Sequence, residues 1–247
     1  MNSASHIDWK KLKVLQQNLS KKVLLEDSFT KEWTLVGGLD VSYSRHKGPS
    51  KACAAAVIFD RTSWTVVNES VAYMDVDIPY VPGFLSFREI PVILEVVEGL
   101  TLLPDIWLVD GAGIAHPRRI GLASHLGVLL DVPTIGVAKS RLVGRHNDLP
   151  KEKGSFVPLV DEATEEVIGT VLRSRTGVKP LYISPGHKVS VRSAVEIVLA
   201  CCTKYRLPEP TRAAHNKVTE AKKAFQKSPN WRYNCISAVK WRVYHDN

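Results

Sequence analysis

Apolar residues recur along the chain at the spacings of helices and strands. Between residues 7 and 25 they fall every three or four positions, with lysines between them, which predicts an amphipathic helix. Three short, apolar, β-prone stretches follow, and the turn-like Asp60-Arg61-Thr62-Ser63 separates the second from the third. Because the connections are short, we expect an antiparallel meander. Its strands are predicted at 34–43, 52–59 and 65–73.

The middle of the chain alternates between helical and strand patterns. An apolar helical face begins near Ser86, and Glu89 three residues later completes a capping-box pattern at the start of this helix. A strand, a helix and a second buried strand follow, an order that predicts parallel strands with a covering helix. These four elements are expected at 86–100, 105–110, 121–130 and 133–138.

The last third of the chain predicts a hairpin, a short strand and two helices. The expected ranges are 154–172, 181–184, 191–205 and 211–225. Three antiparallel strands followed by parallel strands and helices predict an α/β protein with a ribonuclease H-like mixed sheet, covered by helices on both faces. We expect one domain over residues 1–225, followed by a basic tail over 226–247.

The composition argues against a disordered or membrane-spanning chain. Of 247 residues, 45% are hydrophobic, and no apolar run reaches the roughly 18 residues of a membrane span. The first six residues lack the basic-then-apolar order of a secretory signal, so a cytoplasmic location is expected, with the nucleus as a second compartment. Cys53, Cys201, Cys202 and Cys235 lack zinc-type spacing, and the adjacent Cys201 and Cys202 are expected to be core residues of a helix.

The net charge of +8 favours a polyanionic partner, although a mildly basic charge also serves solubility. A net charge of +5 falls from Lys217 onward, where five aromatic residues are interleaved with the basic ones. Such a mixture suits phosphate neutralisation together with base stacking. The alternative is a partly ordered tail that lies on the domain.

Two carboxylates stand in unusual places. Asp40 lies inside the apolar strand 34–43, and Asp110 ends the strand 105–110. A charge within a sheet is costly unless it is paired or bound to a cation, and ligand sites of open α/β sheets lie beyond the carboxyl ends of strands. If the first and fourth strands are neighbours, Asp40, Asp110 and the helical Glu89 form an oxygen-rich site suited to Mg²⁺. Taken singly, each acid is better explained by a cap or a salt bridge.

Lys139 and several histidines are further candidates. Lys139 ends a buried strand, where a cation would meet a phosphate or a carboxylate, and His215 lies in a helix with a basic face, where it could contact phosphate or a metal. His116, His125 and His187 carry less information, because a lone helical histidine such as His125 is more often packed in the core or used as a cap.

Six strings in this sequence resemble the endonuclease V family. The longest, Pro79-Tyr80-Val81-Pro82-Gly83-Phe84-Leu85-Ser86-Phe87-Arg88-Glu89, is specific, whereas the shorter pieces are weak when taken alone. The matches keep the family's order from Gly37 to about His215, roughly three quarters of the chain. The shorter strings are Gly37-Gly38-Leu39-Asp40-Val41-Ser42, Val109-Asp110-Gly111-Ala112-Gly113, Gly136-Val137-Ala138-Lys139, Leu181-Tyr182-Ile183-Ser184-Pro185-Gly186-His187 and Pro208-Glu209-Pro210-Thr211-Arg212.

The resemblance implies a domain that hydrolyses a phosphodiester bond with Mg²⁺, for which Mn²⁺ is expected to substitute. The metal carboxylates carried over are Asp40, Asp110 and Glu89, and the number of ions stays open. Lys139 would offset phosphate charge or orient water. The fourth family position falls on His215, where members carry His or Asp, so its role is left open. The implied catalytic residues are Asp40, Glu89, Asp110, Lys139 and His215.

The resemblance also implies a wedge loop and a base pocket. Two prolines restrict the loop around Tyr80, whose ring could stack on a base once its neighbour is displaced. Without the surrounding string, this loop would be interpreted as a rigid surface turn. The family's pocket is built mainly from backbone, which glycines allow a base to approach closely. The implied substrate-binding residues are Pro79, Tyr80, Pro82, Gly83, Leu85, Gly111, Gly113, His116 and Gly121.

The resemblance implies a monomer that cuts the second phosphodiester bond 3′ to inosine and leaves 3′-hydroxyl and 5′-phosphate ends. The stretch 201–210 is more similar to animal members, which act on inosine in RNA. We therefore expect single-stranded RNA as the substrate, with deoxyinosine-containing DNA in addition. Two alternatives stay open. Another ribonuclease H-like nuclease would share the acids without needing the wedge string, and a non-catalytic inosine or nucleic-acid binding protein would show no metal-dependent turnover.

Overall fold

A computed structural model describes residues 7–30, 32–43 and 50–227, without the side chains of 225–227. The strands form one eight-stranded sheet in the order β3-β2-β1-β4-β5-β8-β7-β6. Their bounds are β1 Leu35–Tyr43, β2 Ser50–Asp60, β3 Thr65–Val76, β4 Ile106–Val109, β5 Thr134–Ala138, β6 Phe156–Val160, β7 Val167–Leu172 and β8 Leu181–His187. The helices are α1 Trp9–Ser20, α2 Leu85–Glu98, α3 Leu122–Leu130, α4 Val191–Cys201 and α5 Glu209–Lys227.

The strand pairing confirms the predicted mixture of antiparallel and parallel strands. β1, β2 and β3 pair antiparallel as a meander, while β1, β4 and β5 run parallel, with α3 connecting β4 to β5. The predicted hairpin is the antiparallel pair β6 and β7, and β8 joins it to β5 with antiparallel pairing on both sides. The first and fourth strands are therefore neighbours, as the argument about the acids required.

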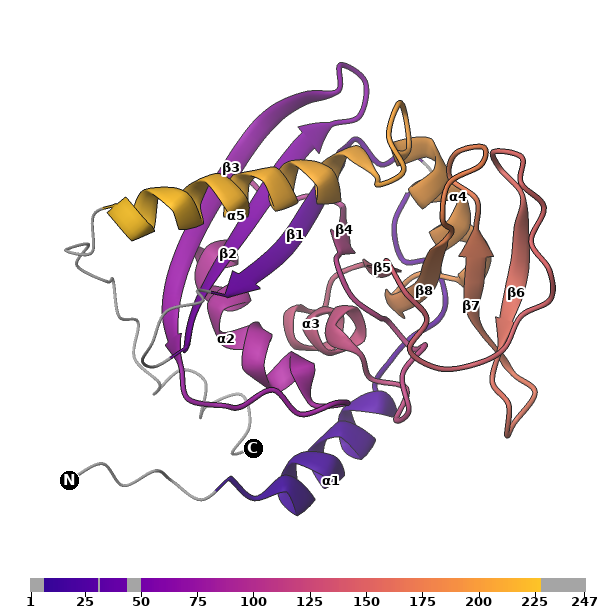
Figure 1. Cartoon of the computed structure of the whole chain (residues 1–247), viewed down its shortest axis with the longest axis horizontal. Coiled ribbons are helices and arrows are strands. Elements are labelled where there is room, and N and C mark those ends of the chain that lie inside the picture. Colours follow the sequence, from indigo (N-terminus) through magenta and orange to yellow (C-terminus); the bar gives the residue numbers. More distant parts are fainter. Residues whose placement is uncertain (1–6, 31, 44–49, 228–247) are drawn as a thin grey trace.

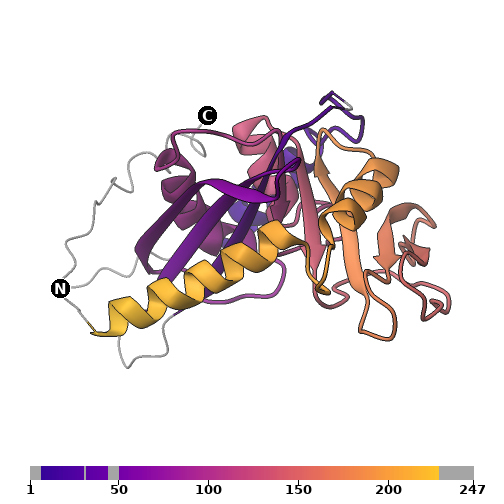
Figure 2. The same ribbon diagram turned by 90° about the horizontal axis from the view of Figure 1, so that it is seen from above.

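Helices cover both faces of the sheet, which confirms the predicted ribonuclease H-like α/β fold. α2 and α3 pack on one face with α1 against α3, and α4 and α5 pack on the opposite face (Figures 1 and 2). Alternate residues of the central strands enter different cores: Leu108 packs on the α4 side, whereas Trp107 and Val109 pack on the α2 side. Within the part of the chain that the structure describes, no helix is long and apolar enough to cross a membrane.

The capping box predicted at Ser86 and Glu89 is wrong. α2 begins one residue earlier, after Phe84, which provides no side-chain cap. The buried Ser86 hydroxyl instead contacts Nδ1 of His125 at 2.9 Å, and Glu89 contacts Tyr43. Both side chains point into the molecule, because the entry angle of α2 turns its first residues toward α3 and β1.

Several helix and strand ends also differ from the predictions. α1 begins at Trp9, where Asp8 accepts hydrogen bonds from two backbone N–H groups, and β8 continues past Ser184 to His187. α4 stops at Cys201, so that Cys202 is buried as the residue after the helix rather than as part of it. α5 runs through residue 225 to Lys227, across the predicted start of the tail. The rest of that tail, 228–247, lies outside the described residues, as does Cys235.

Candidate active site

Asp40 and Asp110 lie close together on two parallel strands, Asp40 inside β1 and Asp110 just past the end of β4. Leu39 pairs with Val109 in the register of β1 and β4, and the backbone N–H of Asp110 donates to the carbonyl of Leu39 at 3.1 Å. The Asp40 carboxylate is 8% exposed and accepts a hydrogen bond from the N–H of Val41 at 2.9 Å. Burial, together with the nearby Asp110, raises the pKa of Asp40 to about 6.

Glu89 reaches the same pair of acids from α2. Its side chain is buried, and its Oε1 accepts a hydrogen bond from the hydroxyl of Tyr43 at 3.2 Å. Burial raises the pKa of Glu89 to about 8, and the charges of Asp40 and Asp110 add to this effect. Tyr43, which nothing in the sequence singled out, lies three residues after Asp40 and orients the third acid.

Two basic side chains pair with the aspartates. The Lys139 ammonium, just past the end of β5, forms an ion pair with Oδ2 of Asp110. Nδ1 of His215 on α5 lies 2.8 Å from Oδ2 of Asp40. The predicted meeting of Lys139 with a carboxylate is therefore observed, and His215 contacts an acid from the opposite face of the sheet.

Gly38 allows α5 to approach β1 closely enough for this contact. A Cβ at Gly38 would lie 2.0 Å from the carbonyl oxygen of Pro210 and 2.6 Å from the nitrogen of Thr211, in the first turn of α5. Gly38 and Asp40 are two positions apart in β1 and so face the same side of the sheet. The small residue that admits the helix thus lies directly beside the acid that the helix contacts.

Arg206 is a further residue near the acids that no sequence pattern singled out. Its guanidinium donates to three carbonyl oxygens, those of Lys139 at 3.0 Å, Lys179 at 2.8 Å and Pro180 at 2.7 Å. Burial lowers the pKa of Arg206, and the charge of Asp110 opposes that shift. Arg206 therefore fixes the backbone that carries Lys139 and adds positive charge near the acids.

The donor set suits a hard divalent cation. Asp40, Asp110 and Glu89 offer only oxygen ligands, and two of the three are buried carboxylates whose raised pKa values record the cost of holding negative charges together. Across the described ranges, no three His, Cys, Asp or Glu side chains are arranged to hold one ion as they stand, and Lys139 and His215 each contact one oxygen of the aspartates. The metal prediction for these residues stays a prediction.

A second group of predicted residues meets at the start of α2. Nε2 of the buried His116 lies 3.2 Å from the carbonyl oxygen of Gly83, which has a φ of 80°. Leu85 is the first residue of α2. The first N–H groups of any helix lack a partner one turn earlier, and here no side chain caps them, although the third donates to the carbonyl of Phe84 at 3.2 Å. Gly83, Leu85 and His116 are therefore close together, beside open backbone donors.

The remaining predicted glycines belong to one loop, between β4 and α3. The N–H of Gly113 donates to the Ser184 hydroxyl at 2.7 Å, and the N–H of Gly121 donates to the Gly113 carbonyl at 2.9 Å. A Cβ at Gly113 would lie 2.1 Å from the carbonyl oxygen of Pro185. Gly113 is thus required for the loop to lie on β8. A Cβ at Gly111 would meet only the Leu122 side chain, so this position has more room.

Comparison with known proteins assigns the chain to a family. The family model "Endonuclease V" matches residues 17–216. The chain belongs to the endonuclease V family. It is 53% identical over 202 residues to the endonuclease V of Rippkaea orientalis, covering 82% of this chain and 86% of that protein.

Two solved structures of endonuclease V have the same fold over nearly their whole length. That from Streptomyces avermitilis is 39% identical with a TM-score of 0.83, and the match covers 92% of this chain and 98% of that chain. That from Ciona intestinalis, in complex with a 24mer DNA containing an inosine followed by a ribo-adenosine, is 29% identical with a TM-score of 0.75, covering 87% and 98%. The match to the family model, over residues 17–216, takes in both groups of residues described above.

The loop before α2, which resembles the endonuclease V wedge, lies on the surface. The Tyr80 side chain is 66% exposed, and Pro79 and Pro82 are exposed on either side of it. Its far end is fixed, because the N–H of Phe84 donates to the Val81 carbonyl at 3.0 Å and Gly83 contacts His116. An exposed aromatic ring on a restricted loop can stack on a base without first rearranging the loop.

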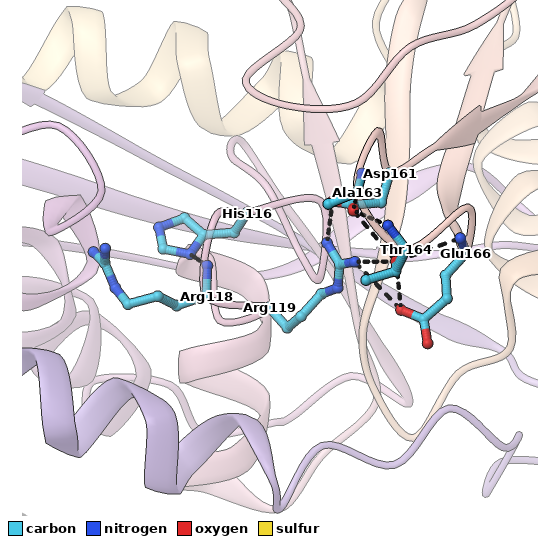
Figure 3. A network of polar contacts seen from close by, with 7 residues as sticks. All are labelled: His116, Arg118, Arg119, Asp161, Ala163, Thr164 and Glu166. Carbon is cyan, nitrogen blue, oxygen red and sulfur yellow. Dashed lines mark hydrogen bonds and ion pairs between the residues drawn. The ribbon is translucent and has the colours of Figure 1, made fainter.

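Consecutive arginines connect the His116 loop to two different parts of this endonuclease V family domain (Figure 3). Arg119, with a φ of 57°, points toward the β6–β7 turn and forms ion pairs with Asp161 at 3.1 Å and Glu166 at 3.3 Å. Arg118 points the other way, toward α1 and Gly83. The loop that carries His116 is therefore held from both sides.

Two of the candidate histidines are buried structural residues, and one of them, His125, packs beside the start of α2. His187 is buried where Nε2 lies 3.3 Å from Asp131 and Nδ1 accepts a hydrogen bond from the N–H of Leu24. His125 packs edge-on against Phe87, with ring centroids 5.1 Å apart. The prediction that His125 is a packed residue is confirmed, and His187 has a comparable structural role between β8 and the segment that follows α1.

Proposed function

We propose that the chain is an endonuclease that hydrolyses the second phosphodiester bond 3′ to inosine, leaving 3′-hydroxyl and 5′-phosphate ends. Its preferred substrate is single-stranded RNA, with deoxyinosine-containing DNA in addition, and its cofactor is Mg²⁺ or Mn²⁺. The observation that carries the proposal is the adjacency of Asp40 and Asp110 where the parallel strands β1 and β4 meet, together with the buried Glu89, whose pKa the charges of both aspartates raise. Membership of the endonuclease V family supports the reaction class.

The catalytic residues have two roles: some would hold the divalent ion, and one neutralises the charge of the phosphate. Asp40, Asp110 and Glu89 would hold the divalent ion, which when bound supplies Lewis-acid polarisation of the scissile phosphate. Lys139 reaches the same place from β5, so its ammonium can neutralise phosphate charge at the bond that breaks. His215 fixes the orientation of the Asp40 carboxylate from α5, and the Tyr43 hydroxyl does the same for Glu89.

Base recognition is assigned to the backbone around Gly83, Leu85 and His116. Hypoxanthine presents an O6 acceptor and an N1–H donor but lacks the 2-amino group of guanine, and the open N–H groups at the start of α2 suit an acceptor such as O6. Backbone packed close to C2 of the base would clash with the 2-amino group of guanine. Adenine would be rejected because it lacks the O6 acceptor and the N1–H donor of hypoxanthine. The Ciona intestinalis relative was crystallised with an inosine-containing DNA, which supports this assignment.

The test uses four labelled oligonucleotides, RNA and DNA, each with one inosine or with a guanosine in its place. We expect cleavage of the inosine strands one bond beyond the adjacent linkage, in Mg²⁺ and not in chelator, with RNA cut faster. Asp110→Ala should abolish cutting while retaining binding of the inosine strand, and Asp148→Ala, the same change at an exposed position between β5 and β6, is the matched control. Equal cutting of inosine and guanosine strands by the unmodified protein, or normal cutting by Asp110→Ala, would refute the proposal.

A further inference from the structure

One backbone carbonyl in the base-recognition segment is contacted by three side chains. The carbonyl oxygen of Gly83 lies 3.0 Å from Nε2 of Gln16, 3.2 Å from Nε2 of His116 and 2.5 Å from Nη2 of Arg118. A carbonyl oxygen has two lone pairs, so three donors exceed the number of hydrogen bonds that it needs in order to be satisfied. This arrangement fixes the peptide plane that leads from Gly83 into α2.

Gln16 connects this carbonyl to α1. Its side chain is completely buried, and while its NH₂ group donates to Gly83, its Oε1 accepts from Nε of Arg118 at 2.5 Å. A buried amide that uses both ends in this way has one orientation, because reversing it would place two donors together and two acceptors together. The match to the family model begins one residue later, at residue 17.

Aromatic contacts hold the same corner. Trp9 on α1 packs edge-on against Phe84 with centroids 5.2 Å apart, and the guanidinium of Arg118 lies 4.4 Å from the centre of the Phe84 ring. Phe84 is the residue between Gly83 and Leu85, the two positions whose backbone is assigned to the base. α1 therefore contacts the segment through a side chain as well as through the carbonyl.

The network also fixes the tautomer of His116. The backbone N–H of Arg118 donates to Nδ1 of His116 at 3.2 Å, as Figure 3 shows, so Nε2 carries the proton and donates to Gly83. Hydrogen bonds therefore connect Gln16 both to the loop after β4, through Arg118, and to the segment before α2, through the Gly83 carbonyl.

We propose that Gln16 is a positioning residue for inosine recognition: from α1 it holds the Gly83 carbonyl and Arg118, so that the backbone of Gly83 and Leu85 fits hypoxanthine and rejects other bases. This inference rests on the proposed function. A site that must separate bases differing by one exocyclic group needs its backbone fixed closely, and Gln16 supplies that restraint from outside the segment.

The test compares Gln16→Leu with Gln17→Leu, the same change at the next, exposed position of α1. Single-turnover cleavage is measured on inosine and guanosine strands, together with the melting temperature. Selectivity for inosine should fall about tenfold in Gln16→Leu, the equivalent of about 1.4 kcal/mol, and stay unchanged in Gln17→Leu. A role in stability alone would lower the melting temperature and the fraction of active protein while leaving that ratio intact.

Arg118→Lys provides a second measurement if Gln16→Leu fails to fold. Lysine keeps the charge but cannot contact Gln16 and Gly83 with separate nitrogens, so selectivity should fall again. Suppose that the unmodified protein prefers inosine. If a folded Gln16→Leu or Arg118→Lys variant then shows the same preference, this inference is overturned and the proposed function is not. A failure of the unmodified protein to prefer inosine would instead refute the proposed function on which the inference rests.

Discussion

The distance between α5 and β1 depends on the absence of a side chain at Gly38, and Gly38→Ala tests what that distance does. The added Cβ would lie 2.0 Å from the Pro210 carbonyl oxygen, so the first turn of α5 must move by about 1.4 Å to reach ordinary contact. The 2.8 Å contact between His215 and Asp40 would then exceed hydrogen-bonding distance. Overpacking of this kind costs about 1–3 kcal/mol of unfolding free energy.

We expect the activity loss in Gly38→Ala to exceed what reduced stability explains. A displacement of about 1 Å at a catalytic group costs about a hundredfold in rate, so kcat on an inosine strand should fall by that factor while the protein remains folded. Gly177→Ala is the control. No atom lies within 4 Å of its added Cβ, but its φ of 74° makes alanine cost about 1 kcal/mol.

The assay pairs urea denaturation with kcat at saturating oligonucleotide for both variants. Gly177→Ala should lose stability and keep its kcat, whereas Gly38→Ala should lose both. If Gly38→Ala retained a kcat like that of Gly177→Ala, the contact of His215 with Asp40 would not matter for the reaction, and the reasoning about α5 would be wrong.

Three further predictions concern metal, pH and backbone conformation. Added Mg²⁺ should raise the melting temperature of the unmodified protein, since a ligand bound only by the folded state stabilises it, and should do so much less in Asp110→Asn; equal shifts would contradict the metal assignment. Burial and Arg118 lower the pKa of His116 to about 4, below the ordinary histidine value of 6.5, so the unfolded state binds more protons between these pH values and stability is lost as pH falls through that window. Between pH 7.5 and pH 5 the unmodified protein should lose about 2 kcal/mol more than His116→Gln, measured by denaturant unfolding, and parallel pH profiles would contradict this. Arg119 has a φ of 57°, so Arg119→Ala should be about 1 kcal/mol less stable than Arg119→Gly although both lose the contacts with Asp161; the reverse order in unfolding free energy would show that the strain is absent.

The local pattern of apolar and polar residues predicted the positions of the strands and helices well where a single physical cause dominated that pattern. The stretches that became β1 through β5 were placed within a few residues. For β2, β4 and β5 the reason is burial, because a strand buried in a sheet needs apolar side chains along its length, whereas the edge strand β3 has one buried residue and was located by its β-prone residues after a turn. Pattern failed at Ser86 and Glu89, where a capping-box spacing coincided with two side chains that the packing of α2 turned inward. It also failed at the end of α4, because Cys202 is apolar and buried without being helical.

The sequence by itself determined which residues are candidates for chemistry. An acid in an apolar strand and another at a strand end stand out because a charge there is costly without a partner, and the string around Tyr80 stands out through its resemblance to the family. Only the tertiary structure decided which partners those residues have. Tyr43, Arg206 and Gln16 are ordinary in their local sequence, and they matter because strands and helices distant along the chain bring them to Glu89, Lys139 and Gly83. Side-chain periodicity reports which face of an element is buried, but it carries no information about which element will cover that face.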